Sequence, residues 1–381
     1  MEILIAPNAF KGSLKADQVA VALAEGLQSS GCGAVTCFPI GDGGDGTMEL
    51  LSGHLKLNPV EVDTVDPLGR PIKASYGYDF YTETAYIEMA DAAGLRLLAF
   101  NELNPTRTNG SGTGLMVLDA LDKGARHIVI GLGGSATVDG GCGILHVLGA
   151  RFLDEKGKEL AAYPSALVDT HQIDMSLLHP RVQYCEFTVL TDVKNTLLGR
   201  TGAAFVFGPQ KGASNDQVEL LDDFLERLNW IWTMQLKKDA ARLAGGGAAG
   251  GTAAGLWAMV DARLVNGIDY FLDVTGFDEQ LERTAVVITG EGAIDRQTLD
   301  GKGPFGVACR AKALNIPVIA VAGRIALQGD EEFADYFDAL IPINHDVLPL
   351  EALKECNVEN LKRTGKLIGN LLQIGAKKTG K

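Results

Sequence analysis

The fold of this chain is decided by the stretch Ala285-Val286-Val287-Ile288-Thr289-Gly290-Glu291-Gly292-Ala293-Ile294-Asp295, which Gly301-Lys302-Gly303-Pro304 follows after a short gap. The continuous apolar run 285–289 is typical of a parallel strand that is buried on both faces. Glycines and two carboxylates come next, and Pro304 marks the first turn of a helix, where proline is favoured. Strand, loop and helix in this order predict an α/β fold with ligands at the carboxyl ends of its strands.

The same alternation of strand and helix occurs at both ends of the chain. Strands are expected at residues 3–6, 36–40, 285–289, 317–322 and 339–343. Apolar residues at helical spacing lie between several of them, as in Val19, Leu23 and Leu27. Strands joined by helices in this way form parallel sheets with helices on their faces.

The middle of the chain has a different pattern. Residues 60–90 predict short, partly alternating strands, and buried strands are expected at 128–132 and 187–190. Ser214 and Gln217 form a capping box before a helix. We therefore expect a Rossmann-like parallel-sheet domain from residues 1–62 and 284–381. A second α/β domain, residues 63–283, would be inserted into it, with small molecules bound in the cleft between the two.

Composition excludes several classes of protein. Glycine makes up 47 of 381 residues and clusters between apolar runs, where it lets the backbone turn or approach a ligand. The net charge of −14 argues against a nucleic-acid binder. No stretch approaches 18 apolar residues and the start opens directly into a strand, so we expect a cytoplasmic protein without membrane contact. The six cysteines are scattered, which favours reduced thiols.

A second loop that could carry chemistry is Gly41-Asp42-Gly43-Gly44-Asp45-Gly46-Thr47, between a predicted strand and a predicted helix. Two carboxylates among four glycines suit Mg²⁺ held partly by water, or a backbone packed close to a ligand. Asp-Gly is also a common turn, so the pattern alone leaves an ordinary turn open.

A third loop, Gly131-Leu132-Gly133-Gly134-Ser135-Ala136-Thr137, satisfies the dinucleotide-binding pattern G-x-G-x-x-A. That fingerprint requires a helix directly after it and an acid about twenty residues further on. Asp154 is roughly in position, but Asp139-Gly140-Gly141 interrupts the expected start of the helix. We favour a loop that cradles phosphate or substrate over a dinucleotide site.

Further charged residues lie near predicted strand ends. Asp192 directly follows a buried strand, where an Asp can serve as metal ligand or general base. Three lysines beside glycine lie near such ends: Lys11, Lys211 and Lys302. The P-loop pattern G-x-x-x-x-G-K-[ST], the motifs of protein kinases and the zinc motif H-E-x-x-H are absent from the sequence.

Together these segments resemble the bacterial glycerate kinase family, of the type with a Rossmann-like domain and a separate mixed-sheet domain. The resemblance runs from Ala6-Pro7-Asn8-Ala9-Phe10-Lys11-Gly12-Ser13 to about Gly323. It includes Asp66-Pro67-Leu68-Gly69-Arg70-Pro71 and residues 131–149, 207–213, 246–251 and 288–302. The family more often has Asp-Ser where this chain has Asn8-Ala9.

The resemblance implies a kinase that uses ATP and Mg²⁺ to convert glycerate to phosphoglycerate, in many family members at the 2-hydroxyl. Phosphoryl transfer requires positioning, charge neutralisation and a group that accepts the hydroxyl proton. We expect Asp192 or Asp295 to be that general base. Asp42 and Glu291 are expected to hold Mg²⁺, directly or through water.

The remaining residues are expected to bind the phosphates of ATP or the glycerate substrate. Lys11, Lys211 and Lys302, with the Gly133 and Gly134 amides, are expected to hold phosphates. Lys11 and Ser135 are further assigned to the substrate. The planar fork of Arg70 matches the glycerate carboxylate, although Arg70 could instead be a turn residue. Transfer is expected to be in line and between the two domains.

Two other functions share these motifs. One is an NAD-dependent dehydrogenase that uses the Gly131-x-Gly133 turn. The other is a non-catalytic sensor of a nucleotide or metabolite. The sequence gives no indication of oligomeric state.

Overall fold

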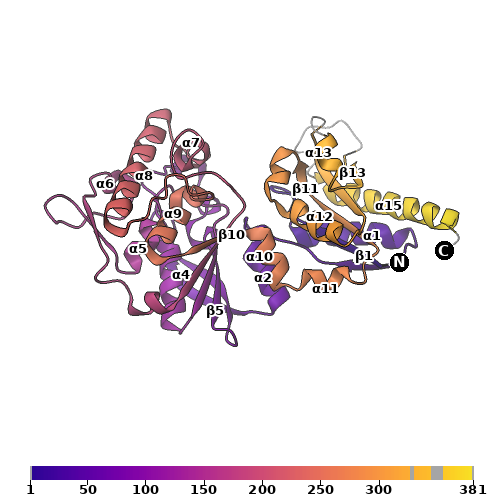
Figure 1. The fold of residues 1–381 in the computed structure, drawn as a ribbon, viewed down its shortest axis with the longest axis horizontal. Coiled ribbons are helices and arrows are strands. Elements are labelled where there is room, and N and C mark those ends of the chain that lie inside the picture. Colours follow the sequence, from indigo (N-terminus) through magenta and orange to yellow (C-terminus); the bar gives the residue numbers. More distant parts are fainter. Residues whose placement is uncertain (1, 327–329, 345–354, 380–381) are drawn as a thin grey trace. The chain divides into compact units, whose positions relative to one another are not determined.

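The computed structural model describes residues 2–326, 330–344 and 355–379 (Figure 1). The chain divides into two compact units. Unit 1 contains the residues up to Asp42 and those from Ile268 onward, and unit 2 is Gly43–Gly267. Within the described ranges, no helix is long and apolar enough to cross a membrane.

Unit 1 is built on a parallel five-stranded sheet with the strand order β13-β12-β11-β1-β2. Its strands are β1 (Glu2–Pro7), β2 (Ala34–Cys37), β11 (Val286–Ile294), β12 (Val318–Ile325) and β13 (Ala339–Pro342). Its helices are α1 (Ala16–Ser29), α10 (Gly267–Val274), α11 (Phe277–Leu281), η5 (Arg296–Asp300), α12 (Gly303–Ala313), α13 (Asp330–Ala334) and α15 (Asn357–Thr379). Figure 1 shows the indigo β1 beside the orange β11, so both ends of the chain contribute to one sheet. The predicted parallel sheet is confirmed.

The apolar run at the start of the chain forms the core of this sheet. Ile3, Leu4 and Ile5 are at most 1% exposed, because helices cover both faces of a central parallel strand. Full burial of one such side chain contributes about 1.5–3 kcal/mol. Burial of these side chains therefore stabilises β1 in its place between β11 and β2.

Strand β11 is longer than the sequence predicts. The apolar run ends at Thr289, but β11 continues to Ile294 because β12 pairs with it throughout. Glu291 lies opposite Ala322 in that ladder. Glu291 is therefore a residue of the strand itself, whereas the sequence suggests a loop after the strand.

Unit 2 is built on a mixed six-stranded sheet with the strand order β10-β9-β6-β5-β4-β3. Its strands are β3 (Asn58–Val65), β4 (Pro71–Asp79), β5 (Thr84–Glu88), β6 (His127–Gly131), β9 (Glu186–Thr191) and β10 (Arg263–Asn266). The four strands β10, β9, β6 and β5 are parallel, and β4 and β3 run antiparallel to their neighbours. A small antiparallel pair joins β7 (Arg151–Leu153) to β8 (Gln172–Asp174). The predicted mixed sheet is confirmed.

The helices of unit 2 differ widely in length. The α-helices are α2 (Thr47–Leu55), α3 (Ala90–Ala93), α4 (Ser111–Asp122), α5 (Cys142–Val147), α6 (Pro164–Leu167), α7 (Ala203–Phe207), α8 (Asn215–Leu236) and α9 (Ala248–Val260). The 3₁₀ helices are η1 (Leu95–Leu97), η2 (Phe100–Glu102), η3 (Pro180–Tyr184) and η4 (Pro209–Lys211). The predicted capping box is present at α8, where Ser214 and Gln217 exchange hydrogen bonds. Within the assigned bounds of α9, Ala249, Gly250 and Gly251 have positive φ angles, so the regular helix begins after them.

The two units divide the chain at 42/43 and 267/268, whereas the sequence places the boundaries at 62/63 and 283/284. Packing gives the reason. Helix α2 lies on β5 and β4 of unit 2, so the first boundary comes before it. Helix α11 packs into unit 1, where the ring of Phe277 lies 5.3 Å from that of Phe38.

Candidate functional site

In unit 1, polar side chains gather at the carboxyl ends of β1 and its neighbours. Asp42 is 3% exposed and accepts a 2.6 Å hydrogen bond from Nδ2 of Asn8, which directly follows β1. The Asn8 Oδ1 in turn accepts a hydrogen bond from its neighbour's backbone, Ala9 N, at 2.8 Å. Asn8 thus orients the Asp42 carboxylate at the sheet edge where ligands bind in α/β proteins.

Glu291 is a second buried acid of unit 1. It is 6% exposed, and its Oε1 accepts a 2.7 Å hydrogen bond from Thr298 Oγ1. Burial raises the pKa of Glu291 to about 7. The charge of Asp42 adds to the rise, and the Thr298 hydrogen bond and the charges of Lys302 and Lys11 oppose it. Asp42, Lys302 and Lys11 thus act electrostatically on Glu291, and the assignment of these residues to a cation and to phosphates remains a prediction.

The N-terminus of α12 belongs to the same group. Lys302 is its N-cap residue and Pro304 lies in its first turn. A Cβ at Gly303 would lie 2.9 Å from Asn8 Nδ2, so a larger residue would require the Asn8 side chain to move. Backbone N–H groups at a helix N-terminus, with a lysine beside them, suit a phosphate. Lys11 lies in the turn after β1 and is exposed.

Asp295 lies immediately after β11 and begins a turn. Its backbone carbonyl accepts a hydrogen bond from Thr298 N at 2.8 Å, and its carboxylate lies 3.7 Å from the Arg324 guanidinium. Asp192, the other predicted base, follows β9 in unit 2 and is half-buried. The structure thus puts the two alternatives in different units, and the choice between them stays a prediction.

In unit 2, the Gly131–Ser135 loop leaves β6 and lies directly against residues 43–46. Gly133 N donates a 3.3 Å hydrogen bond to Gly43 O. A Cβ at Gly133 would lie 2.5 Å from Gly44 Cα, so no other residue fits. Glycine is therefore required at 133 for two backbones to meet, and the assignment of Gly133 and Gly134 to phosphate remains a prediction.

The dinucleotide-binding alternative does not meet its structural requirement. The fingerprint needs a helix that begins directly after the glycines. Residues 135–141 intervene here, and the six-residue α5 begins only at Cys142.

Lys211 lies in the interior of unit 2. It is 2% exposed, and its Nζ donates to Ser135 Oγ at 3.0 Å and to Thr137 O at 2.6 Å. Burial lowers the pKa of Lys211 to about 7, and the charge of Asp139 opposes this shift. Lys211 thus binds the loop that carries Ser135, whereas the sequence suggests a lysine that faces phosphate.

Asp139 was not identified from the sequence, although it organises the same region. It is fully buried, and its carboxylate accepts hydrogen bonds from the backbone N–H groups of Gly110, Gly141 and Gly143 at 2.8–3.0 Å. Burial raises the pKa of Asp139, and these three donors and Lys211 oppose the rise. Asp139 therefore joins the start of α4 to the loop before α5.

Arg70 occupies the turn between β3 and β4. Its Nε lies 2.5 Å from Asp66 Oδ2 and its Nη1 lies 2.6 Å from Glu102 Oε1. The guanidinium fork therefore already binds two carboxylates of the protein. A substrate carboxylate at Arg70 would have to displace Glu102, and this contact favours the turn-residue alternative.

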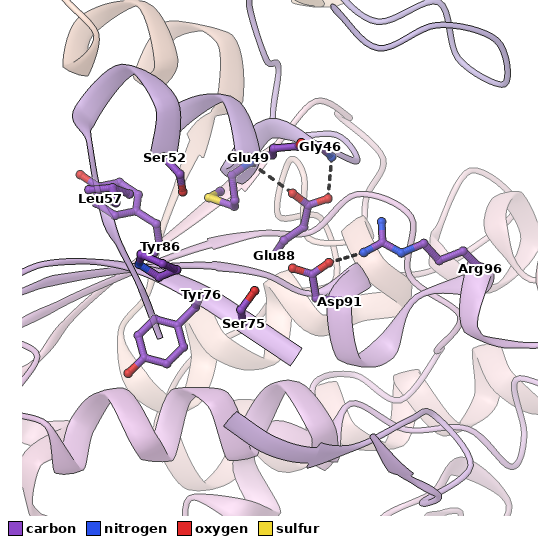
Figure 2. Close-up of a pocket in the computed structure, with 13 residues that line it drawn as sticks. Gly46, Glu49, Ser52, Leu57, Ser75, Tyr76, Tyr86, Glu88, Asp91 and Arg96 are labelled. Carbon is purple, nitrogen blue, oxygen red and sulfur yellow. Dashed lines mark hydrogen bonds and ion pairs between the residues drawn. The ribbon is translucent and has the colours of Figure 1, made fainter. Parts of the chain in front are cut away.

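Glu88, at the carboxyl end of β5, is a further residue that sequence reasoning missed. Figure 2 shows it beneath the first turn of α2, on the wall of a groove of about 350 Å³ that also includes Glu49, Asp91 and Arg96. Its two oxygens accept hydrogen bonds from Gly46 N at 2.6 Å and Met48 N at 3.2 Å. A single acid after an apolar run, Tyr86-Ile87-Glu88, was the available signal.

No group of three or more His, Cys, Asp and Glu side chains that could hold a metal occurs in residues 2–326, 330–344 and 355–379. Magnesium usually keeps several waters and takes only one or two carboxylates from a protein. Asp42 and Glu291 together provide two carboxylates, which is enough for such a magnesium site.

Buried carboxylates, a lysine-flanked helix N-terminus and glycine loops lie at strand ends of this α/β protein, and such groups suit phosphate-bearing ligands. Residues 3–373 match the model of the glycerate kinase family. The chain belongs to the glycerate kinase family, and it is an enzyme of the kinase class.

Relatives of known name are similar over their full length. Glycerate kinase of Bacillus cereus is 38% identical, with 99% of this chain and 100% of that protein covered. Glycerate 2-kinase of Escherichia coli is 37% identical, with 100% of both chains covered. The crystal structure of a candidate glycerate kinase 2 from Salmonella typhimurium LT2 has a TM-score of 0.84 and 39% identity over 99% of each chain.

Proposed function

We propose that this protein transfers the γ-phosphoryl group of ATP to the 2-hydroxyl of glycerate, with Mg²⁺, giving 2-phosphoglycerate and ADP. The observation that carries the proposal is the full-length similarity to glycerate 2-kinase of E. coli. The cluster of Asp42, Glu291 and Lys302 supports it independently, because phosphoryl transfer needs a cation, phosphate-binding groups and little covalent chemistry.

The donor set of unit 1 fits both Mg²⁺ and a nucleotide. Asp42 and Glu291 are buried carboxylates that accept hydrogen bonds from Asn8 and Thr298 respectively. When bound there, Mg²⁺ neutralises charge on the phosphate oxygens. Lys302, Lys11 and the first N–H groups of α12 would bind phosphate oxygens of ATP.

Asp192 is the group we assign as general base. It would accept the proton of the glycerate hydroxyl while the oxygen forms its bond to phosphorus and the bond to the ADP oxygen breaks. Asp295, whose carboxylate lies 3.7 Å from the Arg324 guanidinium, is the alternative.

Ser135 and the amide of Gly134 are our candidates for contact with glycerate and the transferred phosphate. Lys211 would act on them indirectly, because its ammonium group holds Ser135 Oγ and Thr137 O. A fixed hydroxyl loses no orientational freedom when substrate binds, which favours the reactive geometry.

The test is ADP release from ATP and Mg²⁺ with and without D-glycerate, with the position of the product phosphate determined by ³¹P NMR. ADP release that depends on glycerate, with 2-phosphoglycerate as the only product, is expected. 3-Phosphoglycerate would overturn the position of transfer. ATP binding without turnover of any hydroxy acid would instead indicate a sensor.

Asp192→Asn tests the base. We expect kcat to fall by about 10²–10⁴-fold with little change in KM, as for loss of a general base. Asp223→Asn, an exposed acid on α8, is the matched control and should retain full activity. If Asp295→Asn abolishes turnover and Asp192→Asn does not, the base is Asp295.

A further inference from the structure

Glu88 accepts hydrogen bonds at the start of α2, where the N-cap residue cannot accept them. The N-cap residue of α2 is Gly46, which has no side chain to accept a hydrogen bond from the first turn. Glu88, which is 4% exposed, supplies both of its oxygens to Gly46 N and Met48 N. A carboxyl group from β5 thus fixes the start of α2 and the end of the loop before it.

That loop, residues 43–46, lies on the loop 131–134. Gly133 N donates to Gly43 O, and Gly133 is so close to Gly44 that a methyl group would not fit between them. Glu88 is itself paired with Gly131 in the sheet. The Glu88 side chain therefore links β5, which pairs with the strand that leads into the 131–134 loop, to the 43–46 loop that packs on it.

Arg96 provides a second link to the same loop. Its guanidinium donates to Asp45 Oδ1 at 2.8 Å and also to Asp91, which lies in α3. Figure 2 shows Arg96 and Asp91 next to Glu88 at one end of the groove. The 43–46 loop is thus held by Glu88 through its backbone and by Arg96 through Asp45.

The groove borders both α2 and the sheet. Its volume is about 350 Å³, and its lining includes Glu49 of α2 and Ser75 and Tyr86 of the sheet. Close apolar contacts occur on either side of the groove, where Met48 approaches Gly131 and Leu57 approaches Gly77. Thr47, Met48 and Leu51 of α2 are buried, and the hydrogen bonds that Glu88 accepts at the first turn of the helix add to this packing.

We infer that Glu88 and Arg96 are positioning residues for phosphoryl transfer, because they hold the 43–46 loop against the 131–134 loop. The inference rests on the proposed function, in which Gly134 and Ser135 contact glycerate and phosphate. Displacement of reacting groups by about 1 Å can cost a hundredfold in rate, so small movements of these loops matter.

Glu88→Gln is the test, with Glu61→Gln as the matched control. Glutamine preserves the size of the side chain but has one acceptor oxygen, so either Gly46 N or Met48 N loses its partner. Glu61 lies in β3 of the same sheet, is 64% exposed and pairs with Lys73. For each variant, kcat, KM for glycerate, melting temperature and hydrogen exchange of residues 43–49 are measured.

In Glu88→Gln, we expect exchange of the 43–49 amides to accelerate by about tenfold, as for loss of one hydrogen bond. We expect kcat to fall by about tenfold or more with KM changed less than about threefold. Glu61→Gln should match the parent in every measurement. Arg96→Gln, which keeps both Glu88 hydrogen bonds, should lower kcat by a smaller factor and serves if Glu88→Gln does not fold.

Unchanged exchange in Glu88→Gln would overturn the inference whatever the substrate is. Faster exchange with an unchanged kcat would also overturn it, because Glu88 would then only stabilise α2. If the parent protein does not phosphorylate glycerate, the proposed function fails. Exchange of residues 43–49 then still decides whether Glu88 holds the loop.

Discussion

Glu291 is a residue whose ionisation depends on its surroundings. Its side chain is 6% exposed, and burial raises its pKa to about 7, whereas an exposed glutamate titrates near 4.5. The native protein therefore holds this proton up to about pH 7, and the unfolded chain releases it at lower pH. The stability that Glu291 contributes below pH 4.5 is lost as the pH rises through 7.

Glu291→Gln should remove this dependence. Without Mg²⁺, the free energy of unfolding of the variant relative to the parent should be higher at pH 8 than at pH 5 by about 1–3 kcal/mol. Urea unfolding of parent and variant at pH 5 and pH 8, in the presence of a chelator, measures this difference in the free energy of unfolding. An equal difference at both pH values would contradict the raised pKa. Added Mg²⁺ at pH 8 should raise the melting temperature of the parent more than that of the variant.

Residue 133 has to be a glycine because two backbone segments are in contact at this position. Gly133→Ala would bring a Cβ to 2.5 Å from Gly44 Cα and 2.6 Å from Asp45 N. We expect a loss of stability of about 1–3 kcal/mol and a fall in kcat/KM of at least about tenfold. Gly53→Ala is the control, since nothing lies within 4 Å of its Cβ position in the exposed middle of α2. That control should gain up to about 1 kcal/mol.

At the scale of elements, local sequence and long-range pairing compete. The capping box of α8 is specified by residues three positions apart, so the start of the helix can be predicted from them alone. The end of β11 cannot, because Glu291, Ala293 and Ile294 remain in the strand through pairing with β12. The sequence near β11 contains glycines and acids, which by themselves favour a loop.

Ser214→Ala tests the cap. Ser214 Oγ accepts from Gln217 N, and Gln217 Oε1 accepts from Ser214 N. Loss of the hydroxyl should lower the free energy of unfolding by about 1 kcal/mol, as for other N-caps. Urea unfolding measures this, and kcat should be unchanged because α8 carries no proposed site residue. An unchanged midpoint would show that packing alone fixes the start of α8.

At the scale of the whole molecule, the chain leaves unit 1 once and returns once. Unit 2 is one continuous segment, Gly43–Gly267, with its own sheet and its own hydrophobic core that includes Ile128, Phe152 and Trp232. Unit 1 is made of two segments whose strands β1 and β11 pair with each other. Folding of unit 1 must therefore close a loop of more than 200 residues, which costs conformational entropy.

Residues 43–267 produced alone should fold. We expect a cooperative thermal transition and no ADP release with ATP, Mg²⁺ and glycerate, because Asp42, Glu291 and Lys302 are missing. Circular dichroism at increasing temperature provides the measurement. A non-cooperative transition would mean that the core of unit 2 needs the rest of the chain.

The sequence by itself determined the α/β class, the two kinds of sheet and the identity of most strands. Short apolar runs such as residues 3–6 indicate buried strands, and residues 3–6 lie in the buried strand β1. Motif order, from Asn8 to Gly323, also led to the correct family. In the structure Asp42 and Lys302 are close enough to Glu291 to affect its pKa, and the roles assigned to these residues from the sequence stay predictions.

Only the tertiary structure decided what each charged side chain contacts. The sequence predicts that Lys211 and Arg70 bind anions. In the structure Lys211 is buried against Ser135, and Arg70 pairs with Asp66 and Glu102. Asp139 and Glu88 carry no motif, yet each accepts hydrogen bonds from backbone groups distant in sequence. The physical reason is that periodicity and propensity describe neighbours along the chain. Hydrogen-bond partners and burial depend on which segments the fold brings together.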